Sequence, residues 1–266
     1  MWIHNKQRLT SCLSAYKLKP MDTVATAREI IHAASHVHFF TGAGMSADSG
    51  LDTFRDAQTG LWQKVNPQDM ASIEAWQRDP EPMWAWYLWR AHLAHQSQPH
   101  AGHLAIGSLA QRSSQVSVTT QNIDDLHERS GCSDVAHLHG SLVAFRCSSC
   151  HLPYPHHIEL PSKPVSRLRP PHCEECGGLI RPGVVWFGES LPQDQWEKAE
   201  ENMRAADVVV IVGTSGSVWP AAGLPSIAHR AGTPIIEVSP HRSDLTDLAT
   251  VWIEDTAAAA LPAILK

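Results

Sequence analysis

The chain has 266 residues, of which 43% are hydrophobic and 18% charged, and its net charge is −6. This length suffices for one large domain with an inserted lobe, and the composition is that of an ordinary globular protein. The negative charge argues against a general nucleic-acid binder, and no apolar run approaches the roughly 20 residues needed to span a bilayer. We therefore expect a soluble protein that binds neither nucleic acid nor membrane directly.

Residues 1–20 form a basic leader that contains no acidic side chain. Its composition faintly resembles a transit peptide, but it lacks an amphipathic arginine face, and no secretory signal is present. Met21 would serve equally well as the natural start. We expect a disordered leader, a folded region over residues 21–266 and a cytoplasmic location, with targeting to an organelle as the alternative.

Apolar spacing in residues 22–34 predicts an amphipathic helix, and an apolar run at 36–40 then ends in the glycine-rich turn TGAGMSADSG. Strands alternating with helices predict an α/β fold, here a Rossmann-like doubly wound parallel sheet. Its core is expected at 21–60, 99–140 and 183–266. The remaining strands are predicted at 116–119, 135–138, 184–186, 208–212, 235–238 and 251–253, and the helices at 102–111, 193–206 and 221–230.

Two segments stand outside this pattern, a tryptophan-rich helical insertion at 61–98 and a proline-rich lobe at 141–182. The lobe contains two CxxC pairs separated by 22 residues. Two such thiolate pairs complete a closed tetrahedral Zn²⁺ site, which has a structural rather than a catalytic role. Redox cysteines or two disulfides are the alternatives, but nothing in the sequence indicates secretion. The expected ligands are Cys147, Cys150, Cys173 and Cys176.

The polar motifs TGAG, TQNID, HLHG and VGTSGS each follow a predicted strand. Ligands of parallel sheets bind beyond the carboxyl ends of the strands, so these motifs predict one shared site. Gly42, Gly44 and Ala47 fit the dinucleotide pattern G-x-G-x-x-A. The acid that a dehydrogenase places about 20 residues later is missing from LWQKVNP, which disfavours hydride transfer and leaves a different dinucleotide geometry open.

Six motifs occur in one order: GAGMSADSGLDTFRD, TQNIDDLH, HLHGSL, the cysteine quartet, VVWFGE and GTSGSVWPA. Together they resemble the sirtuins, the NAD-dependent protein-lysine deacylases, from about residue 22 to the C-terminus. This resemblance implies that NAD is the co-substrate and that acylated lysines of proteins are the substrates. The residues implied to contact NAD are Gly42, Ala43, Gly44, Ser46, Phe54, Arg55, Gln121, Asn122, Asp124, Gly213, Thr214, Ser215 and Ala257.

Contacts to the adenine end are the least secure part of the resemblance. Many sirtuins have an asparagine after the strand that here reads IIEVSP, where this chain offers Glu237 and Ser239. The C-terminal segment near Ala257 lacks the usual leading glycine, and Asp56 stands where glycine is common.

His139 is the expected catalytic base, with Asn122 and Asp124 as further catalytic candidates. The resemblance implies that the acyl oxygen attacks the nicotinamide ribose, after which a base deprotonates a ribose hydroxyl. A histidine that titrates near neutrality suits this task. Most of the 17 histidines are expected to lie at the surface or to be structural, and His137 is expected to be structural.

The segment VWFGE resembles the sirtuin segment that pairs with an extended substrate peptide. A buried strand that ends in a turn is the other interpretation, and the two are compatible. In the helical insertion, Tyr87 and Arg90 share a helix face and could bind a carboxylate. The resemblance to the desuccinylase branch implies that this pair reads succinyl- or malonyl-lysine and that Ala71 widens the acyl pocket. Tyr87 packed among tryptophans, with Arg90 at the surface, is the alternative. The implied substrate residues are Ala71, Tyr87, Arg90, Val185, Trp186, Phe187, Gly188 and Glu189.

The sequence thus predicts removal of succinyl, malonyl and acetyl groups from lysine, with release of nicotinamide and O-acyl-ADP-ribose. A protein mono-ADP-ribosyltransferase and a non-catalytic NAD or acyl-lysine sensor are the alternatives. The presence of His139, Asn122 and Asp124 argues against the sensor.

Overall fold

A computed structural model describes residues 22–51, 70–112 and 115–266. The predicted NAD contacts Phe54 and Arg55 lie outside the described residues, as do the leader and Asp56. Within the described segments, no helix combines the length and the apolar character that crossing a membrane requires.

Six parallel strands form the main sheet in the order β3-β2-β1-β6-β7-β8. The strand order reverses between β1 and β6, so the sheet has the doubly wound topology and places its ligand crevice where these two strands end. This confirms the predicted fold class. The bounds are β1 His36–Thr41, β2 Gln115–Thr120, β3 Val135–His137, β6 Val208–Val212, β7 Ile235–Val238 and β8 Val251–Ile253.

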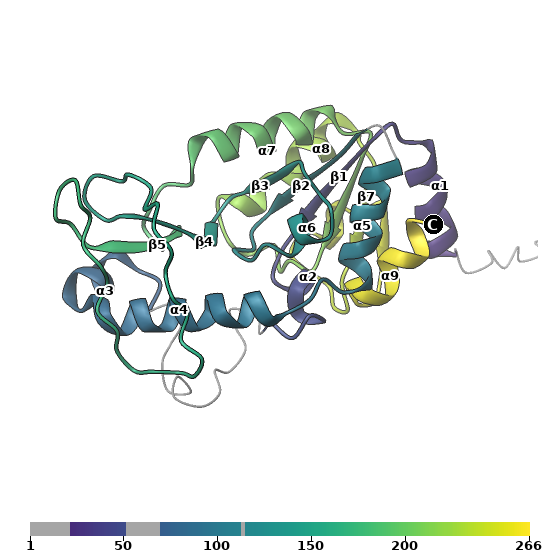
Figure 1. Cartoon of the computed structure of the whole chain (residues 1–266). Helices are drawn as coiled ribbons and strands as arrows, with labels where there is room; N and C mark the ends of the chain where they lie inside the picture. The colour runs from purple at the N-terminus through teal and green to yellow at the C-terminus, as the bar shows by residue number, and fades with distance from the viewer. Residues whose placement is uncertain (1–21, 52–69, 113–114) are drawn as a thin grey trace, which may run out of the picture.

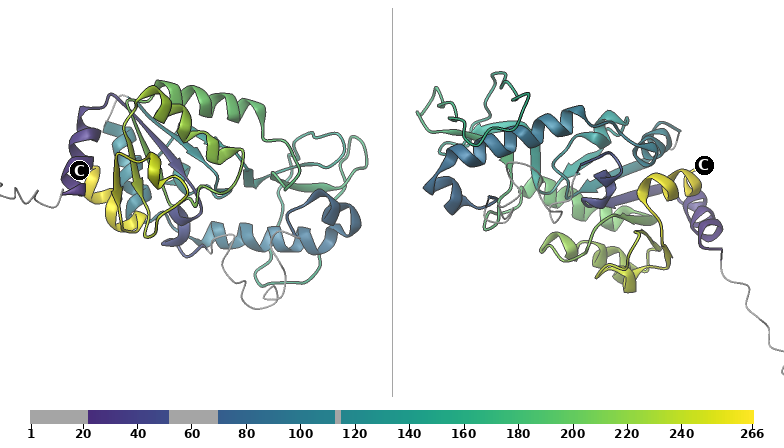
Figure 2. Two further views of the ribbon diagram at one scale, coloured as in Figure 1. Left: turned by 180° about the vertical axis from the view of Figure 1, so that it is seen from behind. Right: turned by 90° about the horizontal axis from the view of Figure 1, so that it is seen from below.

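Helices cover both faces of this sheet (Figures 1 and 2). One face packs against α1 (Thr23–Ala33), α5 (Ala101–Arg112) and α9 (Ala257–Ile264) through a cluster that includes Phe39 and Val210. The other face packs against α7 (Gln193–Ala205) and α8 (Pro225–Ala231), which follows the short 3-10 turn η2 (Ala221–Gly223). The strands are apolar on both faces because both are buried. A further 3-10 turn, η3 (Thr246–Leu248), precedes β8, and the short helices α2 (Gly44–Ala47) and α6 (Leu126–Arg129) follow the carboxyl ends of β1 and β2.

A second lobe lies beside the sheet and has its own apolar core (Figure 1). It comprises α3 (Ile73–Arg78), α4 (Pro80–Gln96) and an antiparallel pair, β4 (Gly140–Cys147) with β5 (Ile180–Val184). The prediction of a strand at 184–186 within the parallel sheet was wrong. The strand lies at 180–184, contains Pro182 and pairs with β4, where a two-stranded ribbon with a register shift tolerates proline.

Helix α4 carries the predicted acyl-binding pair, and local chemistry fixes where it starts. Pro80 occupies the first turn of α4, where its missing N–H costs nothing. Arg167 donates to both carboxylate oxygens of Asp79 at 2.7 and 2.9 Å and to Glu81 at 3.1 Å. The start of α4 is therefore anchored to the long loop between β4 and β5.

Candidate active site

The glycine turn after β1 packs backbone against backbone on the turn after β6. The Gly44 N–H donates to the Gly213 carbonyl at 2.8 Å, and a Cβ on Gly44 would lie 2.8 Å from the Gly213 Cα. A Cβ on Gly42 would lie 2.7 Å from the Cβ of Thr214, and Gly213 itself has a φ of 59°. Glycine is therefore required on both sides of the crevice where β1 and β6 diverge. The helix that follows is only α2, so a helix dipole can add little there.

A hydrogen-bonded polar group joins this turn to the end of β2. The Ser46 hydroxyl donates to the Asp124 carboxylate at 3.0 Å, and the Asn122 amide donates to the Ser46 hydroxyl at 3.0 Å. Burial raises the pKa of Asp124, partly offset by hydrogen bonds from the Leu126 N–H and from Ser46. Three residues predicted from two separate motifs thus form one buried network.

The Gln121 side chain extends this arrangement to the β6 turn. Its amide donates to the Thr214 hydroxyl at 2.9 Å, while its backbone N–H donates to the Thr41 carbonyl at 2.9 Å. Residues that follow β1, β2 and β6 therefore meet at one edge of the sheet, as the strand-end motifs predicted.

The hydrogen bond of His139 defines the tautomer of its imidazole ring. Its Nδ1 lies 2.9 Å from the Gln121 carbonyl oxygen. A carbonyl only accepts, so Nδ1 carries the hydrogen and the neutral ring keeps a lone pair on Nε2. Burial lowers the pKa of His139, and the Gln121 carbonyl only partly opposes this effect. His139 is therefore a neutral imidazole with a proton-accepting Nε2 at pH 7.

His137, two residues earlier, is in the opposite state. Its Nδ1 lies 3.2 Å from the Asn122 carbonyl oxygen and its Nε2 lies 2.6 Å from a Glu128 carboxylate oxygen. Both partners accept, so both ring nitrogens carry hydrogen. Burial lowers the pKa of His137, but the Glu128 hydrogen bond and charge outweigh it, and the pKa is raised overall. His137 is thus bound as a structural cation.

Three histidines that were not among the predicted site residues, the buried His103 and His127 and the half-buried His100, pack against one another next to the glycine turn. The His100 Nε2 donates to the Met45 carbonyl at 2.6 Å, and the His127 Nε2 lies 3.0 Å from the Thr41 hydroxyl. His103 lies between them, with ring centroids 4.2 Å from His100 and 5.2 Å from His127. Burial lowers the pKa of His103 to about 2 and that of His127 to about 4, so both support the turn as neutral rings. One histidine precedes α5, one lies within α5 and one lies in the short polar helix α6, so their spacing gave no signal by which the sequence could identify this group.

The four predicted metal ligands converge in the second lobe. Their sulfur atoms all lie within 4.8 Å of one another, with Cys147 and Cys176 separated by 3.4 Å and Cys150 and Cys173 by 3.7 Å. A tetrahedral site with Zn–S bonds of about 2.3 Å separates its sulfurs by about 3.8 Å. The cysteines in the described segments are all free of disulfides. The quartet can therefore hold one zinc ion.

The segment from Val185 to Glu189 connects the sheet edge to the second lobe. The Val185 N–H donates to the His139 carbonyl at 2.8 Å, and the Phe187 N–H donates to the Ala71 carbonyl at 2.8 Å. The buried Trp186 donates from its indole to the Tyr87 hydroxyl at 3.1 Å. The Val185–Glu189 segment is thus hydrogen-bonded to the predicted base, His139, and to two residues of the predicted acyl pocket, Ala71 and Tyr87.

Tyr87 packs among indole rings, as the structural alternative expected. Its ring centroid lies 4.7 Å from Trp86 and 6.2 Å from Trp186. The Arg90 guanidinium lies over the Trp86 ring, 4.9 Å from its centroid. Burial raises the pKa of Tyr87 to about 12, although the charge of Arg90 acts against it. Tyr87 is therefore a neutral hydroxyl close to a cation.

Ser215 and Ala257, both predicted to contact NAD, differ in their exposure to solvent. Ser215 is exposed, and its hydroxyl lies 2.8 Å from that of Ser217. Ala257 is buried at the start of α9, where its carbonyl would lie 2.5 Å from a Cβ added to Gly102. Glu237 is fully buried in β7 and accepts a hydrogen bond from the Ser243 hydroxyl, so it organises the loop that follows the strand.

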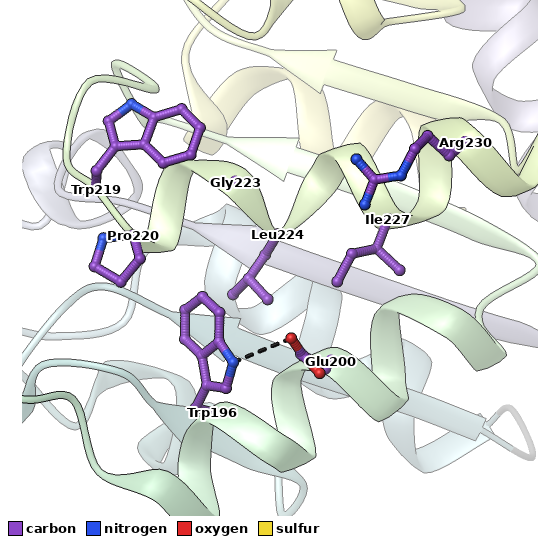
Figure 3. Close-up of a pocket in the computed structure, with 8 residues that line it drawn as sticks. All are labelled: Trp196, Glu200, Trp219, Pro220, Gly223, Leu224, Ile227 and Arg230. Carbon is purple, nitrogen blue, oxygen red and sulfur yellow. Dashed lines mark hydrogen bonds between the residues drawn. The ribbon is translucent and has the colours of Figure 1, made fainter.

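A separate hollow of about 250 Å³ lies between α7 and the segment after β6 (Figure 3). Trp219, which is 73% exposed, faces it, and the Trp196 indole donates to Glu200 at 3.1 Å. None of the predicted site residues lines this hollow. Its lining consists of Trp196, Glu200, Trp219, Pro220, Gly223, Leu224, Ile227 and Arg230.

Residues 42–220 match the sequence model of the Sir2 family, which covers more than half of the chain. The chain belongs to the Sir2 family. It is 54% identical over 246 residues to an NAD-dependent protein deacylase of Corynebacterium glutamicum, covering 92% of this chain and 95% of that protein. It is also 49% identical to the NAD-dependent protein deacylase Sir2 of Mycolicibacterium smegmatis, covering 86% and 95% of the two chains.

Solved Sir2 structures agree with the fold. A Sir2 homologue in complex with NAD is 39% identical and superposes with a TM-score of 0.83, covering 91% of this chain and 92% of that one. A mutant Sir2 homologue in complex with 2′-O-acetyl ADP ribose is 38% identical, with a TM-score of 0.81 and coverage of 93% and 95%. The Sir2-family chain is thus an NAD-dependent protein deacylase, and the predictions of the family, the enzyme class and NAD are confirmed.

Proposed function

We propose that the enzyme removes succinyl and malonyl groups, and also acetyl groups, from lysines of proteins. The observation that carries this proposal is the meeting of Ala71, Tyr87 and Trp186 in one cluster, with Arg90 one helical turn after Tyr87. A neutral tyrosine hydroxyl can donate one hydrogen bond and an arginine donates several, and together they suit an acceptor such as a carboxylate. The small side chain of Ala71 leaves room for a longer acyl group.

For NAD, we propose that the crevice between β1 and β6 holds the dinucleotide. The close approach of Gly44 to Gly213 supports this, since it exposes backbone where two strands diverge. Ser46, Asn122 and Asp124 would border the nicotinamide ribose, and Gln121 and Thr214 would extend toward the adenosine. Bound there, NAD supplies a ribose carbon that is activated by its pyridine leaving group.

We further propose that His139 is the general base. Its Nε2 lone pair faces away from the Gln121 carbonyl, so it can accept a proton from a sugar hydroxyl. The neutral state given by burial means that no prior deprotonation is needed at pH 7. Departure of nicotinamide would leave the acyl oxygen bonded to the ribose carbon, and the deprotonated hydroxyl would then attack the acyl carbon. Addition of water and cleavage of the bond to the lysine nitrogen would release free lysine and O-acyl-ADP-ribose.

The substrate peptide is proposed to lie along the Val185–Glu189 segment. The N–H groups of Val185, Trp186, Phe187 and Glu189 all donate within the chain. Pairing would therefore use the N–H of Gly188 and the carbonyls beside it. A Cβ on Gly188 would meet no atom within 4 Å, which supports an open side at this point.

The test compares succinyl- and acetyl-lysine peptides with the wild type and with Arg90→Met. Loss of a charged partner should lower kcat/KM for the succinyl peptide selectively, by about 2–4 kcal/mol. Arg78→Met is the matched control, because it removes an exposed arginine from α3. Equal losses for the two peptides would refute the carboxylate role. Mass analysis of the products separates deacylation, which gives O-acyl-ADP-ribose, from ADP-ribosylation of the protein.

A further inference from the structure

We infer that Trp186 is a positioning residue for acyl selectivity, because its indole directs the Tyr87 hydroxyl to donate toward the acyl carboxylate. This inference rests on the proposed function, and it concerns a side chain that is 1% exposed. Trp186 would thus select the acyl group through Tyr87 without contacting that group itself.

The argument begins with the hydrogen bond between the two side chains. An indole N–H can only donate, so over the 3.1 Å between Nε1 and the hydroxyl oxygen, Tyr87 must be the acceptor. The hydroxyl proton of Tyr87 then points away from Trp186 and can be donated to another acceptor. Burial also raises the pKa of Tyr87 to about 12, so the group stays a neutral donor across the physiological range. A carboxylate needs such a donor and would be repelled by a tyrosinate.

The indole itself is held rigidly by a buried ion pair. The Arg181 guanidinium lies 3.3 Å from the centroid of the Trp186 ring, and its nitrogens donate to the Glu189 carboxylate at 2.5 and 2.9 Å. Glu189 also accepts from the Trp186 backbone N–H at 2.8 Å. The indole is therefore fixed from its face and from its backbone.

Arg181 also alters the strength of the indole as a donor. A cation over the ring face draws electron density from the π-system, which makes the ring N–H more acidic. The guanidinium is 2% exposed, so water screens this effect weakly. The relay from Arg181 through Trp186 to Tyr87 thus favours one orientation of the Tyr87 hydroxyl.

The competing interpretation is that Trp186 only fills the core between α3, α4 and β5. Its ring lies 5.4 Å from that of Trp76, so a packing role is real. A packing defect would lower the turnover of every acyl peptide together. If the Tyr87 hydroxyl were no longer oriented, the ratio of succinyl to acetyl kcat/KM would fall. This ratio therefore distinguishes a positioning role of Trp186 from a packing role.

The experiment is a double-mutant cycle with Trp186→Phe, Tyr87→Phe and the double variant. Trp186→Phe keeps an aromatic ring under Arg181 and removes the N–H donor together with part of the indole. The ratio of succinyl to acetyl kcat/KM should therefore fall about 3- to 10-fold, whereas the lost volume alone would lower both rates together. The double variant should have the same ratio of succinyl to acetyl kcat/KM as Tyr87→Phe alone, because no hydroxyl remains for Trp186 to orient. Trp84→Phe is the matched control, since this indole of α4 packs edge-on against Phe145, 5.5 Å away.

The outcomes distinguish this inference from the proposed function. If Tyr87→Phe and Arg90→Met lower the ratio but Trp186→Phe does not, the carboxylate pocket stands and the positioning role is refuted. Independent effects of the two ring substitutions would refute it as well. If none of the three variants changes the ratio, the proposed acyl preference itself is wrong.

Discussion

The ion pair between Arg181 and Glu189 should stabilise the link between the sheet and the second lobe, and Glu189→Gln tests this. The substitution keeps the shape of the side chain but leaves the guanidinium of Arg181, 2% exposed, without its counter-ion. Breaking a buried pair costs about 3–5 kcal/mol. Because the Glu189 side chain is 20% exposed, water offsets part of this cost, and we expect a smaller loss of about 2–3 kcal/mol.

Thermal unfolding at pH 7 measures this effect. At about 2–4 °C for each kcal/mol in a domain of this size, the melting temperature should fall by about 4–12 °C. Glu200→Gln is the control, since Glu200 pairs with an Arg204 side chain that is 60% exposed and should shift the melting temperature little.

The pH dependence of this prediction has a definite sign. Burial raises the pKa of Glu189, but the hydrogen bonds from Arg181 and the Trp186 N–H outweigh it, and the pKa is lowered overall. The stabilisation is therefore present above the ordinary glutamate pKa of about 4.3 and is lost as the pH falls through the lower folded value. The difference between wild type and variant should narrow in acid. Equal melting temperatures at pH 7, or a difference that widens in acid, would refute the reasoning.

Two further predictions concern the base and the metal. Because burial lowers the pKa of His139, the acidic limb of kcat/KM should fall below about pH 6.5, and a midpoint above that value would contradict the neutral-base assignment. Cys173→Ser should abolish stoichiometric zinc in metal analysis and make the lobe between β4 and β5 sensitive to protease, since a structural site contributes directly to folding. Cys132→Ser changes a buried cysteine outside the quartet and should retain zinc; equal metal content in both variants would disprove the assignment.

The local sequence predicted structure correctly where a structural element requires particular residue types at a fixed spacing. The predicted strands at 208–212, 235–238 and 251–253 match the observed bounds, because short apolar runs between turns leave few alternatives. The glycine turn and the CxxC pairs were equally readable, since each demands particular residue types at fixed spacing. The strand at 180–184 was displaced in the prediction because Pro182 reads as a strand breaker unless the pairing partner is known.

Contacts between distant side chains could not be read from the sequence. Nothing local distinguishes Arg181 from a surface arginine, although it is among the most buried side chains of the described segments. Likewise, His103 and His127 come together only when α5 packs beside α6. Such groups depend on the tertiary fold, and they concentrate beneath the site because a precise polar arrangement needs a rigid support.

The two histidines of HLHG, His137 and His139, differ in protonation state because they have different hydrogen-bond partners. His137 is the last residue of β3 and His139 lies just beyond it, and the Nδ1 of each ring donates to a backbone carbonyl, that of Asn122 or of Gln121. Only His137 has a carboxylate, Glu128, at its Nε2. That single difference raises the pKa of one ring while burial lowers the pKa of the other. The end of β3 thus carries one cationic imidazole and one neutral imidazole that can accept a proton, so the protonation states follow from the partners rather than from the motif.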